Sequence, residues 1–167
     1  MKKALVLVLA LVLTMGLAVP AAAAGTASPK APTTSETTTA PLPEVTTSEV
    51  KAEDGTVVVV ETIEATDTAK LAEEEKTELA AAQTALAEAA PAGMKAQYFF
   101  FVKVTAKDDA TKEVGPVAMT VKVDNAANVV VMQFVDGKWV ELKTTVNADG
   151  TITIEGVVTA PMAIFTK

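Results

Sequence analysis

The chain has 167 residues, half of them hydrophobic, with 14 basic and 21 acidic residues and a formal net charge of −7. All basic residues are lysine, and the sequence contains no arginine, histidine or cysteine. These absences exclude catalysis by a histidine base, Ser–His and Cys–His nucleophiles, thiolate or imidazole metal sites and disulfide bonds. The negative charge disfavours binding to nucleic acid and to anionic membrane surfaces.

The N-terminal segment, residues 1–24, has the three parts of a secretory signal peptide. Lys2 and Lys3 give a positive start, residues 4–18 are an apolar run, and small residues precede Gly25. The run is shorter than the ~20 residues of a membrane span. We therefore expect cleavage after residue 24 and secretion, with association with the cell envelope as one option and no membrane contact after cleavage.

Residues 25–55 are predicted to form a disordered tether. They hold eight threonines, three serines, four prolines and no aromatic residue. Such a segment cannot bury enough apolar surface to offset the entropy lost on ordering. Thr/Pro-rich tracts are typical of extended spacers, some of them O-glycosylated. Every serine of the protein lies here, so residues 56–167 contain no Ser, His, Cys or Arg.

Residues 56–167 are predicted to form one domain that opens with a strand and a helix. Thr56–Glu64 is rich in β-branched residues, which is typical of a strand. A helix is expected over residues 67–90, with Asp67 as its N-cap. Apolar residues recur at helical spacing on the face expected to be buried, namely Leu71, Leu79, Ala82, Leu86 and Ala90.

After residue 95 the hydrophobic period becomes two, as in half-buried strands. Asp136-Gly137 and Asn147–Gly150 have the composition of tight hairpin turns. The pattern predicts a mostly β (α+β) fold, an antiparallel β-sandwich of Ig-like character with one amphipathic helix after the first strand. The expected strands are Ala96–Ala106, Pro116–Asp124, Asn128–Val135, Lys138–Val146, Thr151–Glu155 and Met162–Thr166.

Three stretches, GPVAMTVKV, VVVMQFVDGKWVELKTTVNADGTITIEG and PMAIF, lie between Gly115 and Phe165. They resemble a recurring C-terminal β-sandwich module of secreted and surface proteins from Gram-positive, Clostridia-like bacteria. The shared features are the first strand, the DGKW hairpin, the turn before TIT and the closing strand. The resemblance implies an extracellular, non-catalytic module, and it transfers no catalytic residue to this chain.

Trp139 is the main candidate for a binding residue. It alternates with Val140 and Leu142, so it faces outward if those two side chains face the core. Together with Tyr98, Phe99 and Phe101 it would then form an aromatic patch for carbohydrate or a protein partner. The alternative is that Trp139 lies on a sheet face that the helix covers.

The remaining polar residues do not point to a metal site or to catalysis. The turn NADGT at 147–151 lacks the alternating ligands and the downstream glutamate of a calcium loop. Acidic residues such as Glu141 and Glu155 occupy outward strand positions rather than a cleft suited to glycoside hydrolysis. We therefore expect no metal, no cofactor and no enzymatic activity.

The sequence favours a secreted, non-catalytic cell-envelope or interaction module carried on a flexible tether. Its expected partner is cell-wall or host polysaccharide, or another surface protein. The alternative is a carbohydrate-binding or enzyme-accessory module that uses exposed aromatic residues around Trp139. A third option is an exported domain with no ligand of its own.

Overall fold

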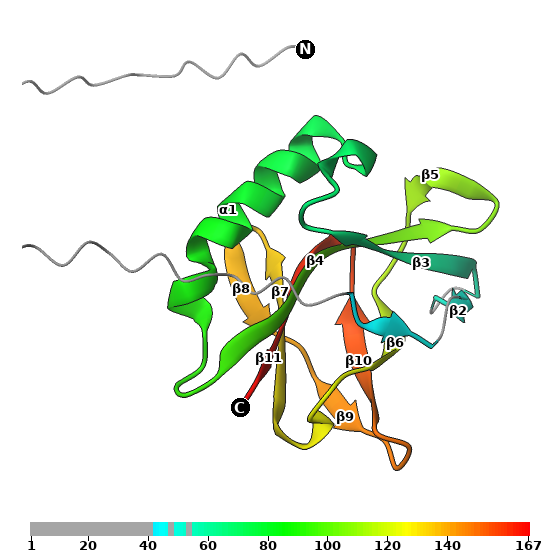
Figure 1. Ribbon diagram of the computed structural model, residues 1–167. Helices are drawn as coiled ribbons and strands as arrows, with labels where there is room; N and C mark the ends of the chain where they lie inside the picture. The colour runs from blue at the N-terminus through cyan, green and yellow to red at the C-terminus, as the bar shows by residue number, and fades with distance from the viewer. Residues whose placement is uncertain (1–41, 47–48, 53–54) are drawn as a thin grey trace, which may run out of the picture. The chain divides into compact units, whose positions relative to one another are not determined.

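The computed structural model describes residues 42–46, 49–52 and 55–167. The predicted signal peptide and most of the predicted tether lie outside the described residues. The described part contains two antiparallel sheets and confirms the predicted β-sandwich (Figure 1). The smaller sheet has the order β1 (Glu44–Val45), β6 (Val117–Lys122), β10 (Thr151–Val157), β9 (Thr144–Val146). The larger has the order β2 (Glu49–Lys51), β3 (Val57–Glu64), β4 (Lys95–Ala106), β11 (Ala160–Thr166), β7 (Val129–Val135), β8 (Lys138–Glu141), and β5 (Asp109–Glu113) also pairs with β4.

The main core lies between the two sheets. Alternate residues of each strand point inward, because the side-chain period of a strand is two. From the larger sheet, Phe100, Val102 and Val104 of β4 enter this core, and each is fully buried. From the smaller sheet, Met119 of β6 and Ile154 of β10 meet them, also fully buried.

Helix α1 (Glu73–Ala89) covers the outer face of the larger sheet and makes a third layer. Near its start, Leu79 packs with Leu71, Ile63 and Phe101, and near its end Leu86 packs with Ala163 and Phe165 on β11. Strand β4 is therefore buried on both faces along much of its length. This explains why both alternating sets of its sequence, KAQYFFFVKVTA, contain large apolar residues.

The helix begins later than predicted. Asp67 precedes a short 3₁₀ turn, η1 (Thr68–Lys70), and makes an ion pair with Lys70 instead of a capping hydrogen bond. The α-helix starts at Glu73, after Ala72, whose N–H donates to the Glu75 carboxylate at 2.6 Å. The predicted start at residue 67 was wrong because Leu71, directly after the 3₁₀ turn, is buried and has helical spacing to Leu79, although it precedes the α-helix.

Three short strands were missed. β1 and β2 lie within the predicted tether, so order begins before residue 56, and Val45 and Val50 pack partly against the core between the sheets. The Thr46 N–H also donates to the Thr120 carbonyl at 3.0 Å. All five residues of β5 are exposed, so its sequence carries no alternation that would indicate a strand.

The predicted hairpin turn at Asp136-Gly137 joins β7 to β8. Both residues have positive φ, 52° and 75°, as the tight turn between paired strands requires. β7 lies between β11 and β8, so it is an internal strand, which its nearly continuous apolar sequence VVVMQFV suits.

Candidate interaction surface

The four aromatic residues predicted to form a binding patch do not share one surface. Phe101 is fully buried beneath α1, in the cluster with Leu79. Tyr98 is on the opposite face of β4, in the core between the sheets, with 7% of its surface exposed. Only Phe99 and Trp139 meet, so the expected exposed patch of four residues is corrected to one partly buried pair.

Trp139 packs between the larger sheet and α1. Its ring centroid lies 6.2 Å from that of Phe99 and 5.4 Å from that of Phe134, its cross-strand neighbour. It joins the cluster of Leu86 and Ala163, and the small Ala163 separates Phe99 from β7 in the strand ladder, which leaves room for the indole. The Trp139 Nε1 is buried and has no hydrogen-bond partner within the described residues. The geometry therefore agrees with the interpretation of Trp139 as a side chain on the helix-covered face.

A continuous segment, Lys138–Val146, forms an edge of both sheets, and we call it the edge segment. It runs as β8 along the larger sheet and then as β9 along the smaller one. Where it crosses, the Leu142 N–H donates to the Val131 carbonyl at 2.9 Å, and the Lys143 carbonyl accepts from the Glu155 N–H at 3.0 Å. Backbone hydrogen bonds thus fix the segment to both sheets.

The edge segment exposes apolar side chains. Among the described residues three large hydrophobic side chains are exposed, Val57, Val140 and Val146, and the last two lie on this segment with 48% and 49% of their surfaces exposed. Val140 pairs with the buried Gln133 and so lies on the inner face, as predicted from its alternation with Trp139. It is exposed on that face all the same, because β8 is the outermost strand of the larger sheet and no described strand covers it.

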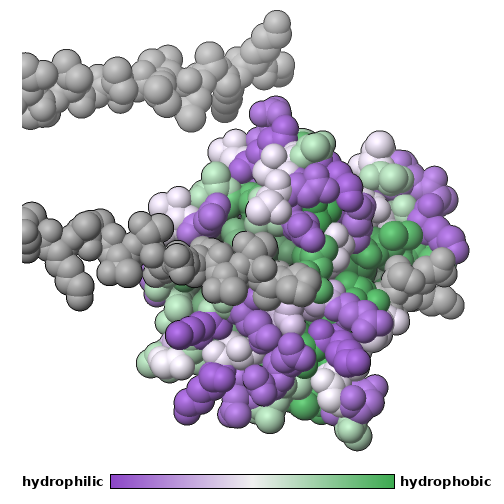
Figure 2. All heavy atoms as spheres, in the orientation of Figure 1, coloured by the Kyte–Doolittle hydropathy of each residue, from purple (hydrophilic) through white to green (hydrophobic). Residues whose placement is uncertain are grey.

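The other edges of the sandwich differ from the edge segment. Charged residues and short length are the usual means by which proteins prevent unwanted pairing at sheet edges. β5 is exposed throughout and three of its five residues are charged, and β1 and β2 have only two and three residues. Figure 2 shows that, on the face drawn, hydrophobic residues emerge in small areas between hydrophilic ones. Exposed valines on two consecutive edge strands are therefore a distinguishing feature of the edge segment.

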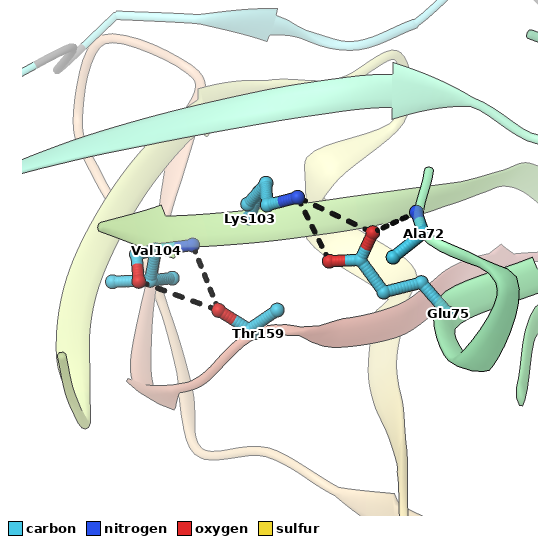
Figure 3. Close-up of polar contacts among 5 residues, drawn as sticks. All are labelled: Ala72, Glu75, Lys103, Val104 and Thr159. Atoms are coloured by element: carbon cyan, nitrogen blue, oxygen red, sulfur yellow. Dashed lines mark hydrogen bonds and ion pairs between the residues drawn. The ribbon is translucent and has the colours of Figure 1, made fainter. Parts of the chain in front are cut away.

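Several of the partly buried polar side chains bind one another or the backbone. Figure 3 shows Glu75 with Lys103 and the Ala72 N–H, and Thr159 with the backbone of Val104. The Thr159 hydroxyl accepts from the Val104 N–H at 3.0 Å and donates to its carbonyl at 3.3 Å, which ties the start of β11 to β4. These contacts position the helix and the strands.

Glu78, which lies on α1, is a carboxyl group whose pKa is perturbed. Partial burial raises its pKa, and the negative charges of Glu113, Glu75 and Asp136 raise it further. A perturbed carboxyl group is a feature of many functional sites. Across residues 42–46, 49–52 and 55–167, however, no three His, Cys, Asp or Glu side chains are placed to hold a metal ion.

None of the helices in the described ranges is long and apolar enough to cross a membrane. Comparison of the chain with protein-family models, with curated proteins and with solved structures gave no match.

Proposed function

We propose that the protein is a secreted, non-catalytic interaction module that its N-terminal segment carries at the cell envelope. The partner is envelope or host polysaccharide, or another surface protein. Export is supported by the signal-peptide pattern of residues 1–24. The resemblance of residues 115–165 to modules of secreted and surface proteins supports the same location.

The observation that carries the interaction role is the pair of exposed valines on the edge segment. Exposed apolar residues on open sheet edges favour association with another molecule. Val140 and Val146 lie on consecutive strands that form the same border of the sandwich. The chain therefore offers apolar side chains beside backbone groups that point away from the sheets.

The non-catalytic part of the proposal is supported by the contacts of the least exposed polar side chains, which bind one another or the backbone. Lys103 and Glu75 neutralise each other, and they retain only 26% and 13% of their side-chain exposure. The fully buried Gln133 donates to the Val158 carbonyl at 2.7 Å and accepts from the Val158 N–H at 3.2 Å. With no Ser, His, Cys or Arg beyond residue 55, the groups left for catalysis are few.

Export is tested by expressing the full chain in a Gram-positive host and separating cytoplasm, envelope and medium. We expect the chain in the envelope or the medium, with a mass that corresponds to a start at Gly25. An unprocessed chain retained in the cytoplasm would overturn the proposal.

The interaction role is tested by co-sedimentation of the purified, processed chain with isolated Gram-positive envelopes. The variants Val140→Lys and Val146→Lys should reduce the bound fraction. The matched control is Val57→Lys, which alters the third exposed valine, at the start of β3. Equal binding by all variants would place the interaction away from the edge segment, and absence of binding by the wild-type chain would contradict envelope recognition.

The alternative, a carbohydrate-binding module around Trp139, receives less support from the geometry. Two of the four aromatic side chains are buried, and the Trp139 Nε1 is enclosed. A sugar-binding face needs accessible aromatic rings on which the sugar can stack. Only the partly exposed surfaces of Trp139 and Phe99 are left for this role.

A further inference from the structure

We propose that residues 42–46 and 49–52, which we call the N-terminal strap, are an autoinhibitory cover that prevents two copies of the chain from associating through β3. The strap supplies one strand to each sheet, β1 to the smaller and β2 to the larger, and so forms one border of the sandwich. Because β2 lies outside β3 in the larger sheet, β3 becomes the edge strand when β2 leaves. This inference requires neither export nor an external partner.

The two halves of β3 differ in charge and in cover. Its first half, Val57–Val60, is uncharged, and three of these four valines pair with β2. Among the described residues, its second half pairs with no residue of β2, and it carries two exposed glutamates, Glu61 and Glu64. Charged side chains are a usual protection of an open strand edge. β2 therefore covers the part of β3 that has no charge of its own to prevent unwanted pairing.

The backbone of β3 is arranged to accept another strand in place of β2. The Ala52 N–H donates to the Thr56 carbonyl at 3.0 Å, and on the other side of β3 the Lys107 N–H donates to the Val57 carbonyl at 2.9 Å. Backbone groups of successive residues in a strand point to alternate sides, so Val58 directs its N–H and C=O toward β2. These groups lose their partner when the strap opens.

The first half of β3 suits pairing with the same segment of a second copy. Valine is among the residues that favour strands, and uncharged β-branched segments without proline are typical of self-associating sequences. Pairing of the uncharged run with itself also places no like charges opposite one another. A second copy is therefore the partner that we assign to the opened edge.

The strap is held by few contacts. In the described register, β1 pairs with two residues of β6, and β2 pairs with three of β3. Val45 and Val50 pair with the fully buried Val121 and Val58, and they pack partly against the core between the sheets. Short peripheral strands with few buried contacts open at a lower cost in free energy than central strands. The strap can therefore leave while the rest of the sandwich stays folded.

The proposal is tested by sedimentation velocity of the processed chain at about 100 µM, within the range in which unpaired strand edges lead to association. The wild-type protein should be monomeric. The double variant Val45→Asp/Val50→Asp removes the apolar contacts of the strap, and its weight-average mass should rise about twofold or more. Gln133→Leu is the matched control, because it disturbs a fully buried position and leaves the strap in place. It should stay monomeric.

A third substitution tests whether β3 is the site of association. Val57→Lys adds a charge to the uncharged run at an exposed position, so in the strap variant it should restore the monomer. Circular dichroism of dilute samples checks that each variant is folded, and Val50→Ala is the milder replacement if the double variant is not. A folded strap variant that stays monomeric would overturn the proposal, as would association that Val57→Lys does not reduce. Equal association of the wild-type chain or of Gln133→Leu would also overturn it.

Discussion

Lys103, in the middle of β4, forms an ion pair with Glu75, in the first turn of α1, with 2.9 Å between Nζ and Oε1. The Lys103 Nζ also lies 3.2 Å from the second carboxylate oxygen, which accepts the Ala72 N–H at 2.6 Å. A single carboxylate thus satisfies a backbone donor at the start of the helix and holds the helix to the sheet.

Replacement of Glu75 should therefore remove two contacts at once. We expect Glu75→Ala to lower the free energy of unfolding by about 1–2 kcal/mol, the sum of a lost helix cap and a partly buried ion pair. Glu75→Gln keeps an acceptor for the Ala72 N–H and should cost less. Urea unfolding monitored by circular dichroism measures both variants. Glu74→Ala, at an exposed neighbouring position, is the control, and a loss of the same size there would contradict the role given to Glu75.

Glu78 should make the folded state less stable at neutral pH than at acidic pH. Burial and the neighbouring Glu113, Glu75 and Asp136 raise its pKa above 4.5, so the folded state binds the proton more tightly than the unfolded state. The unfavourable effect of its charge is fully present above the folded pKa and disappears as the pH falls below the unfolded pKa. We expect Glu78→Gln to raise the melting temperature at pH 7 and to lose this advantage near pH 4.

The matched control for Glu78 is Glu88→Gln, which changes an exposed glutamate near the other end of α1. It should leave the difference in melting temperature between pH 7 and pH 4 close to that of the wild-type protein. A Glu78→Gln variant that is less stable than wild type at pH 7 would show that the charged carboxylate makes a favourable contact.

The sandwich was predictable because its strands carry an alternating pattern that a two-sheet core requires. β6, β7 and β10 lie within about two residues of their expected limits. β4 is different, since both of its faces are apolar, and only the position of α1 shows which element covers each face. The exposure of Val140 could not be predicted either. Alternation gives the face of a sheet on which a residue lies, but strand order decides whether that face is covered at the residue.

The placement of Tyr98 and Phe99 shows the same distinction. They are adjacent in the sequence and therefore point to opposite faces of β4, which the period of two already implied. The prediction that both belong to one patch with Trp139 was wrong, because of the two only Phe99 lies on the same face of the larger sheet as Trp139. The type and origin of the module stay a prediction, since the β-sandwich establishes the fold and no partner.

Gln133 should be among the most sensitive positions of the domain. Its side chain is fully buried, and it satisfies both the N–H and the carbonyl of Val158. Gln133→Leu leaves both half-buried backbone groups of Val158 without this partner and places the loss beside a fully buried position, so we expect a loss of about 2–4 kcal/mol in the free energy of unfolding. Gln83→Leu, at an exposed position of α1, is the control and should cost less than about 0.5 kcal/mol. Equal losses for the two variants would contradict the role of the Val158 contacts.

The fluorescence of Trp139 tests whether its indole is packed beneath α1 or is available to a ligand. The indole packs against Phe99 and Phe134, and its Nε1 is enclosed, so its fluorescence should be quenched by acrylamide less than that of the unfolded chain. Trp139→Phe removes the edge-on contact with Phe134 and much of the packing under α1, and it should lower the free energy of unfolding by about 1–2 kcal/mol. Trp139 is the only tryptophan, so the wild-type signal reports this position alone.

Addition of soluble cell-wall polysaccharide should leave the emission maximum unchanged. A saturable shift of that maximum, together with protection from acrylamide by the polysaccharide, would instead favour the carbohydrate-binding alternative, because it would require the indole to contact the sugar.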